Sequence, residues 1–302
     1  MASRTILGLS WAAGVPEVRL VDDQAEVSTL QPVVGLQLNY RAGPDALRRC
    51  LGRAPFRKAD ASHTDCLNRP EKGSRLCRQC SISDATFASN LHHAHTKDRA
   101  TIDPAIAEHL RQPNLLYLAA FRDGSIKVGT TTSKRATKRL AEQGAWRARL
   151  VAHASDGYAV REIEDRATEE LGLAQSVSIS RKLDGMASPV PDDNLIEMLV
   201  RHATAVDELR ARMSDKRLDA HRDQWIFPNS DAELWTGLHR YPLKLNTGQH
   251  DIEVVAACGR MVVVQRCGTT DVFVADLGQL YGIEMVIGDY ESDELAVQDS
   301  LF

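Results

Sequence analysis

Four side chains suited to phosphodiester chemistry fall at the ends of neighbouring predicted elements in residues 114–172. They are Tyr117, Lys127, Arg139 and Glu164. Hydrolysis of a phosphodiester needs an activated water, a metal or cation at the phosphate, and help for the leaving oxygen. Taken singly, each residue is more often a satisfied core tyrosine or a surface charge, so it is their joint arrangement that indicates a site.

The hydrophobic pattern around these residues predicts the elements that carry them. Runs of apolar, β-type residues predict three strands, over 115–121, 126–130 and 147–154. Helices are expected over 134–142 and 158–171, and the apolar stripe of the second helix recurs every four residues. The predicted order is therefore strand, strand, helix, strand, helix, with Gly124 in the hairpin turn between the first two strands.

Basic residues gather on the first of these helices and at the start of the third strand. Residues 122–149 hold eight Lys and Arg against two Asp and Glu, although the net charge of the whole chain is −4. Like charges this close repel each other unless an anion is present, and a solvated surface is the common alternative. The sequence predicts nucleic-acid contacts through Lys134, Arg135, Lys138 and Arg147.

Four cysteines in residues 41–96 have the spacing of a metal site. Cys50, Cys66, Cys77 and Cys80 form the pattern C-x15-C-x10-C-x2-C, and two thiolates separated by two residues can reach one tetrahedral ion. The surrounding segment is polar and basic, so it cannot bury enough apolar surface to hold itself together. We therefore predict a closed structural zinc site. A redox pair, which would need a surrounding βαβ pattern, and four unrelated core cysteines are the alternatives.

Four histidines near the cysteines are rival metal ligands. They are His63, His92, His93 and His95. Neighbouring histidines on one loop seldom all reach the same ion, so a solvated polar linker is the favoured interpretation. A contact between these histidines and phosphate stays open as an alternative.

Strands are expected at both ends of the chain. The first group covers 5–11, 18–21 and 34–40, and the second covers 251–257, 261–266, 272–275 and 283–287. An amphipathic helix is predicted over 192–213, with a continuation over 216–222. The expected fold class is α+β, in five parts: an N-terminal β segment (1–40), the cysteine arm (41–96), a central three-stranded sheet with helices (97–190), a helical brace (191–224) and a small C-terminal β domain with an acidic tail (225–302).

Composition indicates the cellular compartment and the kind of binding partner to expect. The sequence has no run of about 18 consecutive apolar residues, so neither a transmembrane helix nor a membrane partner is expected. Six cysteines in 302 residues are too few for a disulfide framework, which favours a reduced, cytoplasmic setting. Aromatic residues make up only 5% of the chain, which gives little support for a base-stacking platform. Duplex or structured nucleic acid is favoured, with DNA ahead of RNA.

Short motifs in the central block resemble a known nuclease fold. Leu115-Leu116-Tyr117, Lys127-Val128-Gly129, Arg139-Leu140 and Glu164, in this order, are similar to a divergent GIY-YIG nuclease core. The order of predicted elements is similar to that fold as well. Together with the cysteines, these motifs resemble a bacterial and archaeal family of uncharacterised proteins that pairs a cysteine-rich segment with such a core.

The resemblance implies a separate role for each matched residue. Tyr117 would lie near the attacking water, Arg139 would hold the scissile phosphate, and Glu164 would ligate one Mg²⁺ or Mn²⁺ ion. Gly129 would stand where the backbone passes close to its neighbours. Lys127 replaces the tyrosine of the second motif, and it could lower the pKa of Tyr117 or contact phosphate as a point charge.

The sequence thus favours a metal-dependent nucleic-acid phosphodiester hydrolase that also carries a structural zinc ion. One alternative is a protein of the same fold that binds nucleic acid without cutting it, since Lys127 in place of tyrosine is compatible with both. The other alternative is a regulatory or scaffold protein in which zinc only stabilises the fold.

Overall fold

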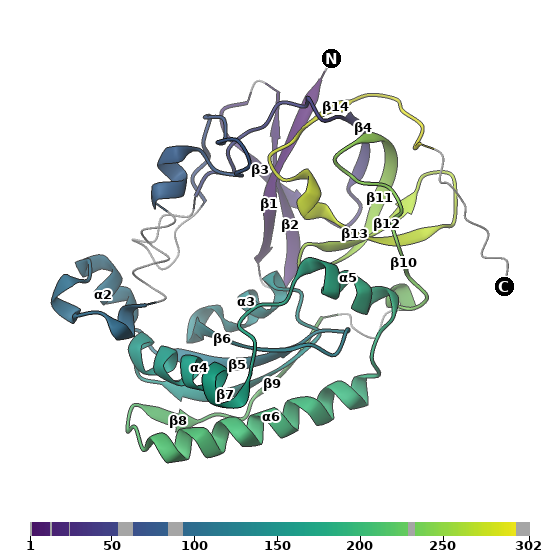
Figure 1. Ribbon diagram of the computed structural model, residues 1–302. Helices are drawn as coiled ribbons and strands as arrows, with labels where there is room; N and C mark the ends of the chain where they lie inside the picture. The colour runs from purple at the N-terminus through teal and green to yellow at the C-terminus, as the bar shows by residue number, and fades with distance from the viewer. Residues whose placement is uncertain are drawn as a thin grey trace.

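The computed structural model describes residues 2–12, 14–23, 25–53, 63–83, 93–228 and 233–293. Two β-sheets lie one above the other, with helices α3 and α5 between them and helices α4 and α6 on the far side of the smaller sheet (Figure 1). The expected α+β class is confirmed, as a mixed fold with large sheets and few helices.

The larger sheet has nine strands, in the order β10-β13-β12-β11-β4-β14-β1-β2-β3. Its strands are β1 (Ser3–Ala12), β2 (Val15–Asp22), β3 (Thr29–Pro32), β4 (Gln37–Ala42), β10 (His239–Arg240), β11 (Gly248–Cys258), β12 (Met261–Arg266), β13 (Val272–Asp276) and β14 (Glu284–Ile287). All neighbours are antiparallel except β10 and β13.

The two ends of the chain, expected from the sequence to be separate segments, form this one sheet. Strand β4 pairs with both β11 and β14, and β14 also pairs with β1. Each apolar run predicts a strand by its own composition, but the partner of a strand depends on residues more than 200 positions away in the sequence. A local pattern therefore contains no information about this pairing.

The smaller sheet contains the predicted central strands and two more. It is formed by β5 (Asn114–Ala120), β6 (Ile126–Thr132), β7 (Arg147–Ala154), β8 (Leu218–Ala220) and β9 (Gln224–Ile226). The order is β6-β5-β7-β8, and β9 also pairs with β7. The predicted continuation of the long helix over 216–222 is wrong, because β8 occupies this range and adds to the sheet edge.

The helices follow the predicted order in the central block. They are α2 (Pro104–Leu110), α3 (Ala136–Glu142), α4 (Gly157–Leu171), α5 (Ile179–Ala187) and α6 (Asp192–Met213). Short 3₁₀ turns lie at η1 (Ala94–Thr96), η2 (Arg99–Thr101), η3 (Ser133–Arg135), η4 (Glu233–Trp235) and η5 (Leu277–Leu280). The side chain of Asp156 caps α4 by accepting hydrogen bonds from two backbone N–H groups, and Gly172 ends that helix in the left-handed conformation.

Strand β5 is buried on both faces, and the alternation of its side chains divides the core in two. Leu116 and Leu118 face the main core with α4 and α6, whereas Tyr117 and Phe121 belong to a smaller cluster with Leu140 of α3. Successive residues of a strand point to opposite faces, so both faces of β5 are covered by helices. This arrangement presents Tyr117 to the α3 side of the sheet.

Aromatic rings join the two sheets. Phe227 follows β9 and stacks on Trp146, which directly precedes β7 of the smaller sheet, with a centroid distance of 5.4 Å. It meets Trp11 of the larger sheet at 6.1 Å and Trp235 at 5.7 Å, both edge to face. The guanidinium of Arg122 lies 4.4 Å from the Trp146 ring centroid and donates to the carbonyl of Trp235 at 2.6 Å. Phe227 is thus the ring that both sheets share.

Within the part of the chain that the structure describes, no helix is long and apolar enough to cross a membrane.

We expect Phe227→Ala to lower the free energy of unfolding by about 3–5 kcal/mol, because Phe227 is 3% exposed and its removal leaves a cavity between the sheets. The adjacent Ile226 is 54% exposed, so Ile226→Ala should change the free energy of unfolding by less than about 1 kcal/mol. Urea unfolding followed by tryptophan fluorescence measures both. Equal effects would contradict the role assigned to Phe227.

Candidate functional site

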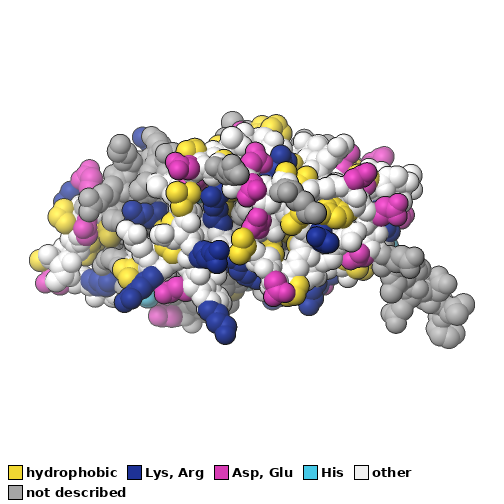
Figure 2. All heavy atoms as spheres, turned by 90° about the horizontal axis from the view of Figure 1, so that it is seen from above, with side chains coloured by type: hydrophobic (Ala, Val, Ile, Leu, Met, Phe, Trp, Pro, Cys, Tyr) yellow, Lys and Arg dark blue, Asp and Glu magenta, His cyan; other side chains and the backbone are white. Residues whose placement is uncertain are grey.

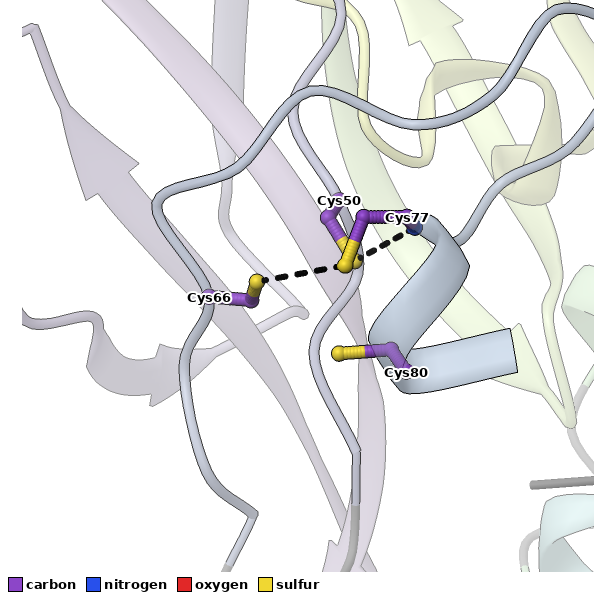
Figure 3. Close-up of side chains that lie close together, drawn as sticks. All are labelled: Cys50, Cys66, Cys77 and Cys80. Carbon is purple, nitrogen blue, oxygen red and sulfur yellow. Dashed lines mark hydrogen bonds between the residues drawn. The ribbon is translucent and has the colours of Figure 1, made fainter. Parts of the chain in front are cut away.

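The four cysteines of the arm come together in space, as their spacing predicts (Figure 3). Cys50, Cys66, Cys77 and Cys80 each offer a sulfur atom, and these atoms all lie within 4.8 Å of one another. The Sγ atoms of Cys66 and Cys77 are 3.8 Å apart. Four Zn–S bonds of about 2.3 Å in a tetrahedron would separate the sulfurs by about 3.8 Å. The four thiols could hold a metal ion such as zinc.

Backbone N–H groups support the sulfur of Cys50. The N–H of Cys77 donates to it at 3.1 Å and that of Gly52 at 3.5 Å. Gly52 adopts a φ of +72°, and a Cβ there would lie 2.3 Å from the carbonyl oxygen of Thr64, so only glycine fits this turn. Such N–H donors orient a ligand and stabilise its negative charge, as the partners of a metal ligand do.

The thiols have unequal proton affinities without a metal ion. Hydrogen bonding, first from the backbone of Cys80, lowers the pKa of Cys77 to about 6. Burial raises the pKa values of Cys50 and Cys80. A bound metal ion favours the thiolate form of all its ligands, which offsets the unfavourable burial of these sulfurs.

The histidines are not part of this group in the described residues. His63 pairs with Asp65 at 3.5 Å, and Nε2 of His95 pairs with Asp165 at 2.8 Å. His92 lies outside the described residues, so the alternative that it is a ligand is not addressed. Among the described residues, the four cysteines are accordingly the group that could hold a metal ion.

Tyr117 lies on β5 with its hydroxyl covered. The side chain is 1% exposed, and Nε2 of Gln143 donates to the hydroxyl at 2.6 Å. The ring lies directly over Gly129 of β6, where a Cβ would come within 2.4 Å of the hydroxyl oxygen. The close approach that the sequence predicts at Gly129 is therefore present. Burial raises the pKa of Tyr117, and Gln143 and Arg139 offset only part of this effect, so the phenol keeps its proton at neutral pH.

Lys127 lies on the same face of the sheet as Tyr117. Its Nζ is 5.8 Å from the centroid of the Tyr117 ring, and the side chain is buried. Burial, together with repulsion from Arg139 and Lys182, lowers the pKa of Lys127 to about 8. Desolvation disfavours the charged form of a lysine, so the ammonium is held in place at an energetic cost that an anion would reduce.

Glu164 reaches the same region from α4. Its carboxylate is buried, lies 3.4 Å from the guanidinium of Arg161 and accepts from the Thr130 hydroxyl at 3.5 Å. Burial raises the pKa of Glu164, whereas Arg161 and Lys127 lower it. This carboxylate is also close enough to Tyr117 to affect its pKa.

Arg139 lies on the exposed side of α3. It acts on the pKa values of both Tyr117 and Lys127, so all four residues of the predicted cluster interact electrostatically. The structure therefore brings Tyr117, Lys127, Arg139 and Glu164 to one region, although they come from four different elements. We call this group with Gln143 the β5 cluster.

The four residues predicted to contact nucleic acid divide between two places. Lys134 is exposed next to α3, and Arg135 and Lys138 both pair with Glu142 at 3.5 and 3.9 Å. Arg147 instead forms an ion pair with Asp192 at the start of α6, and the indole N–H of Trp146 donates to the same carboxylate at 2.8 Å. Lys134, Arg135 and Lys138 lie close to Arg139 in the sequence. Arg147 is instead engaged in its ion pair with Asp192.

Three further residues belong to this region, and the sequence did not reveal them. Gln143 holds the Tyr117 hydroxyl, Arg161 pairs with Glu164, and Lys182 on α5 donates to the Gln143 carbonyl at 2.8 Å. Arg161 stands three residues before Glu164, a spacing that places two side chains together on a helix and could have indicated the pair. The positions of Gln143 and Lys182 depend on tertiary packing, for which no local spacing exists.

The fold and the cysteine cluster define a two-sheet α+β protein with four thiols that could hold a metal ion. A family model described as a protein of unknown function (DUF2797) matches residues 60–251, more than half of the chain, and the chain belongs to this family. The matched range includes Cys66, Cys77 and Cys80 as well as the smaller sheet. Neither the comparison with curated proteins nor the comparison with solved structures found a match. The membership of an uncharacterised family, expected from the sequence, is confirmed.

We expect the purified protein to contain one tightly bound metal ion per chain, and Cys77→Ser to lose it, because a structural site of this kind needs all four thiolates. Cys267 is exposed and lies outside the cluster, so Cys267→Ser is the matched control and should keep the ion. Elemental analysis by mass spectrometry measures the metal content. The same content in Cys77→Ser and wild type would rule out the four-cysteine site.

Proposed function

We propose that the protein is a metal-dependent hydrolase of nucleic-acid phosphodiesters, with a divergent GIY-YIG-like core in its smaller sheet. The observation that carries this proposal is the β5 cluster, in which Tyr117, Lys127, Arg139 and Glu164 interact although they lie on four elements. Two cations, a phenol and a carboxylate in one region match what the hydrolysis of a phosphodiester requires. The order of strands and helices supports the same proposal.

The protein's own residues have distinct roles in this proposal. Arg139 and Lys127 hold the phosphate and offset the charge that develops on it in the transition state. Tyr117 keeps its proton, since burial raises its pKa, and it accepts a hydrogen bond from Gln143. The protonated hydroxyl can therefore donate a hydrogen bond to a water or a phosphate oxygen, and it does not act as a base. Of the two roles that the sequence left open for Lys127, phosphate contact has the better support.

Glu164 is the residue proposed to hold Mg²⁺ or Mn²⁺. Mg²⁺ usually keeps several waters and binds through one or two carboxylates together with substrate phosphates, so a single carboxylate fits its chemistry. Such an ion would lower the pKa of a bound water and offset charge on the phosphate. Because Arg161 lies 3.4 Å from the carboxylate, we expect the ion to bind much more tightly together with nucleic acid than alone.

The zinc ion proposed for the cysteine cluster is structural. Four protein ligands leave no open coordination position, which is the property of closed zinc sites. Zinc would fix a polar, basic arm that has few apolar contacts of its own, since only Leu76 packs against the cysteines among the described residues. The arm would then add contacts to a phosphate-rich partner.

A second candidate function is binding of nucleic acid without cleavage. The specific observation in its favour is the covered hydroxyl of Tyr117, which lies under Gln143 in a side chain that is 1% exposed. Lys127 also stands where a second tyrosine is expected. In this case the cations still contact phosphates, and affinity falls steeply with salt. A regulatory or scaffold protein stabilised by zinc is the third candidate.

The charge distribution favours a local site over a broad basic surface. In Figure 2, Lys and Arg are interspersed with Asp and Glu across the visible face, and the net charge of the chain is −4. Affinity for nucleic acid would then come from the few cations of the β5 cluster and the basic residues near α3, through a small number of phosphate contacts. We propose duplex or structured DNA ahead of RNA as the substrate, and a cytoplasmic setting.

We expect Mg²⁺- or Mn²⁺-dependent cleavage of DNA or RNA by the full chain, and a loss of roughly 100-fold or more in Glu164→Gln, since a metal ion contributes several kcal/mol to such a transition state. Glu169 is exposed on the same helix, so Glu169→Gln is the matched control. Gel assays on labelled single- and double-stranded DNA and RNA measure the rates.

Three other results would point elsewhere. Cleavage that survives Glu164→Gln at the wild-type rate indicates a contaminating nuclease. Retention of nucleic acid without any metal-dependent cleavage favours the binding protein. No retention even at low salt favours the scaffold, because phosphate contacts are strongest under those conditions.

A further inference from the structure

Helix α5 lies close against the smaller sheet, at the turn between β5 and β6. Gly185 of α5 permits this contact, since a Cβ there would lie 2.2 Å from the backbone nitrogen of Asp123. The guanidinium of Arg181 donates to the Asp123 carboxylate at 2.9 Å. On its other side, α5 packs against β10 and β13 of the larger sheet. The helix is therefore fixed between both sheets, above the face of β5 that carries Tyr117.

This position brings Lys182 into the β5 cluster. Its Nζ lies 4.3 Å from the centroid of the Phe121 ring and donates to the Gln143 carbonyl at 2.8 Å. The side-chain amide of Gln143 in turn donates to the Tyr117 hydroxyl at 2.6 Å. An ammonium group has three donors, so Lys182 has capacity for a further acceptor beyond Gln143.

Positive charge exceeds negative charge around this lysine. Repulsion from Arg139 and Lys182 lowers the pKa of Lys127, and repulsion from Arg139 also lowers that of Lys182. The one carboxylate that acts on Lys127 is Glu164, and it already pairs with Arg161. Asp123 acts on Lys182, but it already pairs with Arg181 at 2.9 Å. Partly buried cations such as Lys127 and Lys182 are unfavourable in a low-dielectric setting when they lack equivalent counter-charges. An anion bound among the three would remove the repulsion.

We infer that Lys182 forms, with Lys127 and Arg139, a binding site for a phosphate group. The phosphate is one of the backbone phosphates of a nucleic acid, and in that respect the inference rests on the proposed function. The anion site itself depends only on the three cations. Lys182 comes from a helix outside residues 114–172, so the resemblance that suggested the other two residues does not include it.

A purely structural role for Lys182 makes different predictions. If the lysine only holds the Gln143 carbonyl, then a neutral donor such as glutamine should replace it. If it contacts phosphate, then only a cation should replace it, because the contact depends on charge. Lys182→Gln, Lys182→Met and Lys182→Arg therefore separate the two roles. Lys216 is exposed and lies next to β8, so Lys216→Met is the matched control.

The experiment measures binding of two probes to the full chain without added divalent ions, at several salt concentrations. The probes are a fluorescent DNA duplex of about 20 base pairs, followed by anisotropy, and pyrophosphate, followed by calorimetry. We expect Lys182→Met and Lys182→Gln to weaken binding of both probes by about tenfold. The slope of log affinity against log salt for the duplex should fall by about one. Lys182→Arg should stay within about threefold of wild type, and Lys216→Met should be unchanged.

Wild-type affinity and salt slope in Lys182→Gln or Lys182→Met would overturn the inference. So would equal losses in Lys182→Arg and Lys182→Met, because a cation would then not restore binding. Thermal unfolding of each variant identifies losses that come from misfolding. Binding through Lys182 without metal-dependent cleavage would refute the hydrolase and leave the phosphate site in place. Metal-dependent cleavage that is unchanged in Lys182→Met would support the hydrolase and refute the phosphate site at Lys182.

The pH dependence of binding provides a further test. Burial lowers the pKa of Lys182 to about 8, with Arg139 and Arg260 acting in the same direction and Cys258 and Asp123 against it. Cys258 stays protonated in this range, because burial raises its pKa to about 12. Lys182 is charged below its pKa and neutral above it, so wild-type affinity should fall as the pH rises through about 8. In Lys182→Arg this fall should be smaller, since arginine stays charged.

Discussion

The structure depends on the contact between its two sheets. Phe227 and Trp146 stack at 5.4 Å, and Trp11 meets Phe227 from the larger sheet at 6.1 Å. Buried aromatic pairs combine a large apolar area with a preferred geometry, so this contact fixes the orientation of the sheets as well as their distance. Arg122 is buried there as well, over the face of Trp146, with its charge partly compensated by the ring.

That contact also determines where the β5 cluster lies. The turn between β11 and β12 presses on the end of α3, and a Cβ on Gly259 would lie 2.6 Å from the nitrogen of Gly144. Gln143 immediately precedes Gly144, so the residue that holds the Tyr117 hydroxyl is positioned by the larger sheet. Helix α5, which carries Lys182, is held between the same two sheets. The candidate site is therefore a product of the whole fold, even though its first four residues lie in one short stretch of sequence.

Elements with a strong local pattern could be predicted from the sequence, and so could the cysteine cluster. The strand β7 and the helix α6 have the predicted bounds, because apolar periodicity defines both. The cysteines lie together as their spacing predicts, in an arrangement that could hold a metal ion. By contrast, β3 is mostly exposed and α5 is a short helix within a Ser-rich stretch, so neither was predicted. The helix expected over 216–222 failed because pairing with β7 outweighed local propensity.

Tertiary contacts also limit which residues of the candidate site could be predicted from the sequence. Tyr117, Arg139 and Glu164 could be found because a resemblance assigns them by order along the chain. Gln143 and Lys182 could not, because an amide that caps a phenol and a lysine from a neighbouring helix are defined only by tertiary contact. The direction of the pKa shift at Tyr117 was also out of reach. The sequence places cations near the phenol, but burial, which the sequence does not quantify, outweighs them.

The pKa shifts in the β5 cluster have different consequences for binding a phosphate and for cleaving a phosphodiester. Burial disfavours the charged form of every ionisable group, so it lowers the pKa of Lys127 and raises those of Tyr117 and Glu164. The proposed phosphate among Lys127, Arg139 and Lys182 would stabilise all three cations at once, and this gain would require no proton transfer. Cutting requires in addition a group that removes a proton from water at neutral pH, and Tyr117 cannot be that group while it stays buried. Within the proposed function, the chain's own side chains would therefore favour phosphate binding directly, and they would support cleavage only if the carboxylate of Glu164 recruits a metal ion.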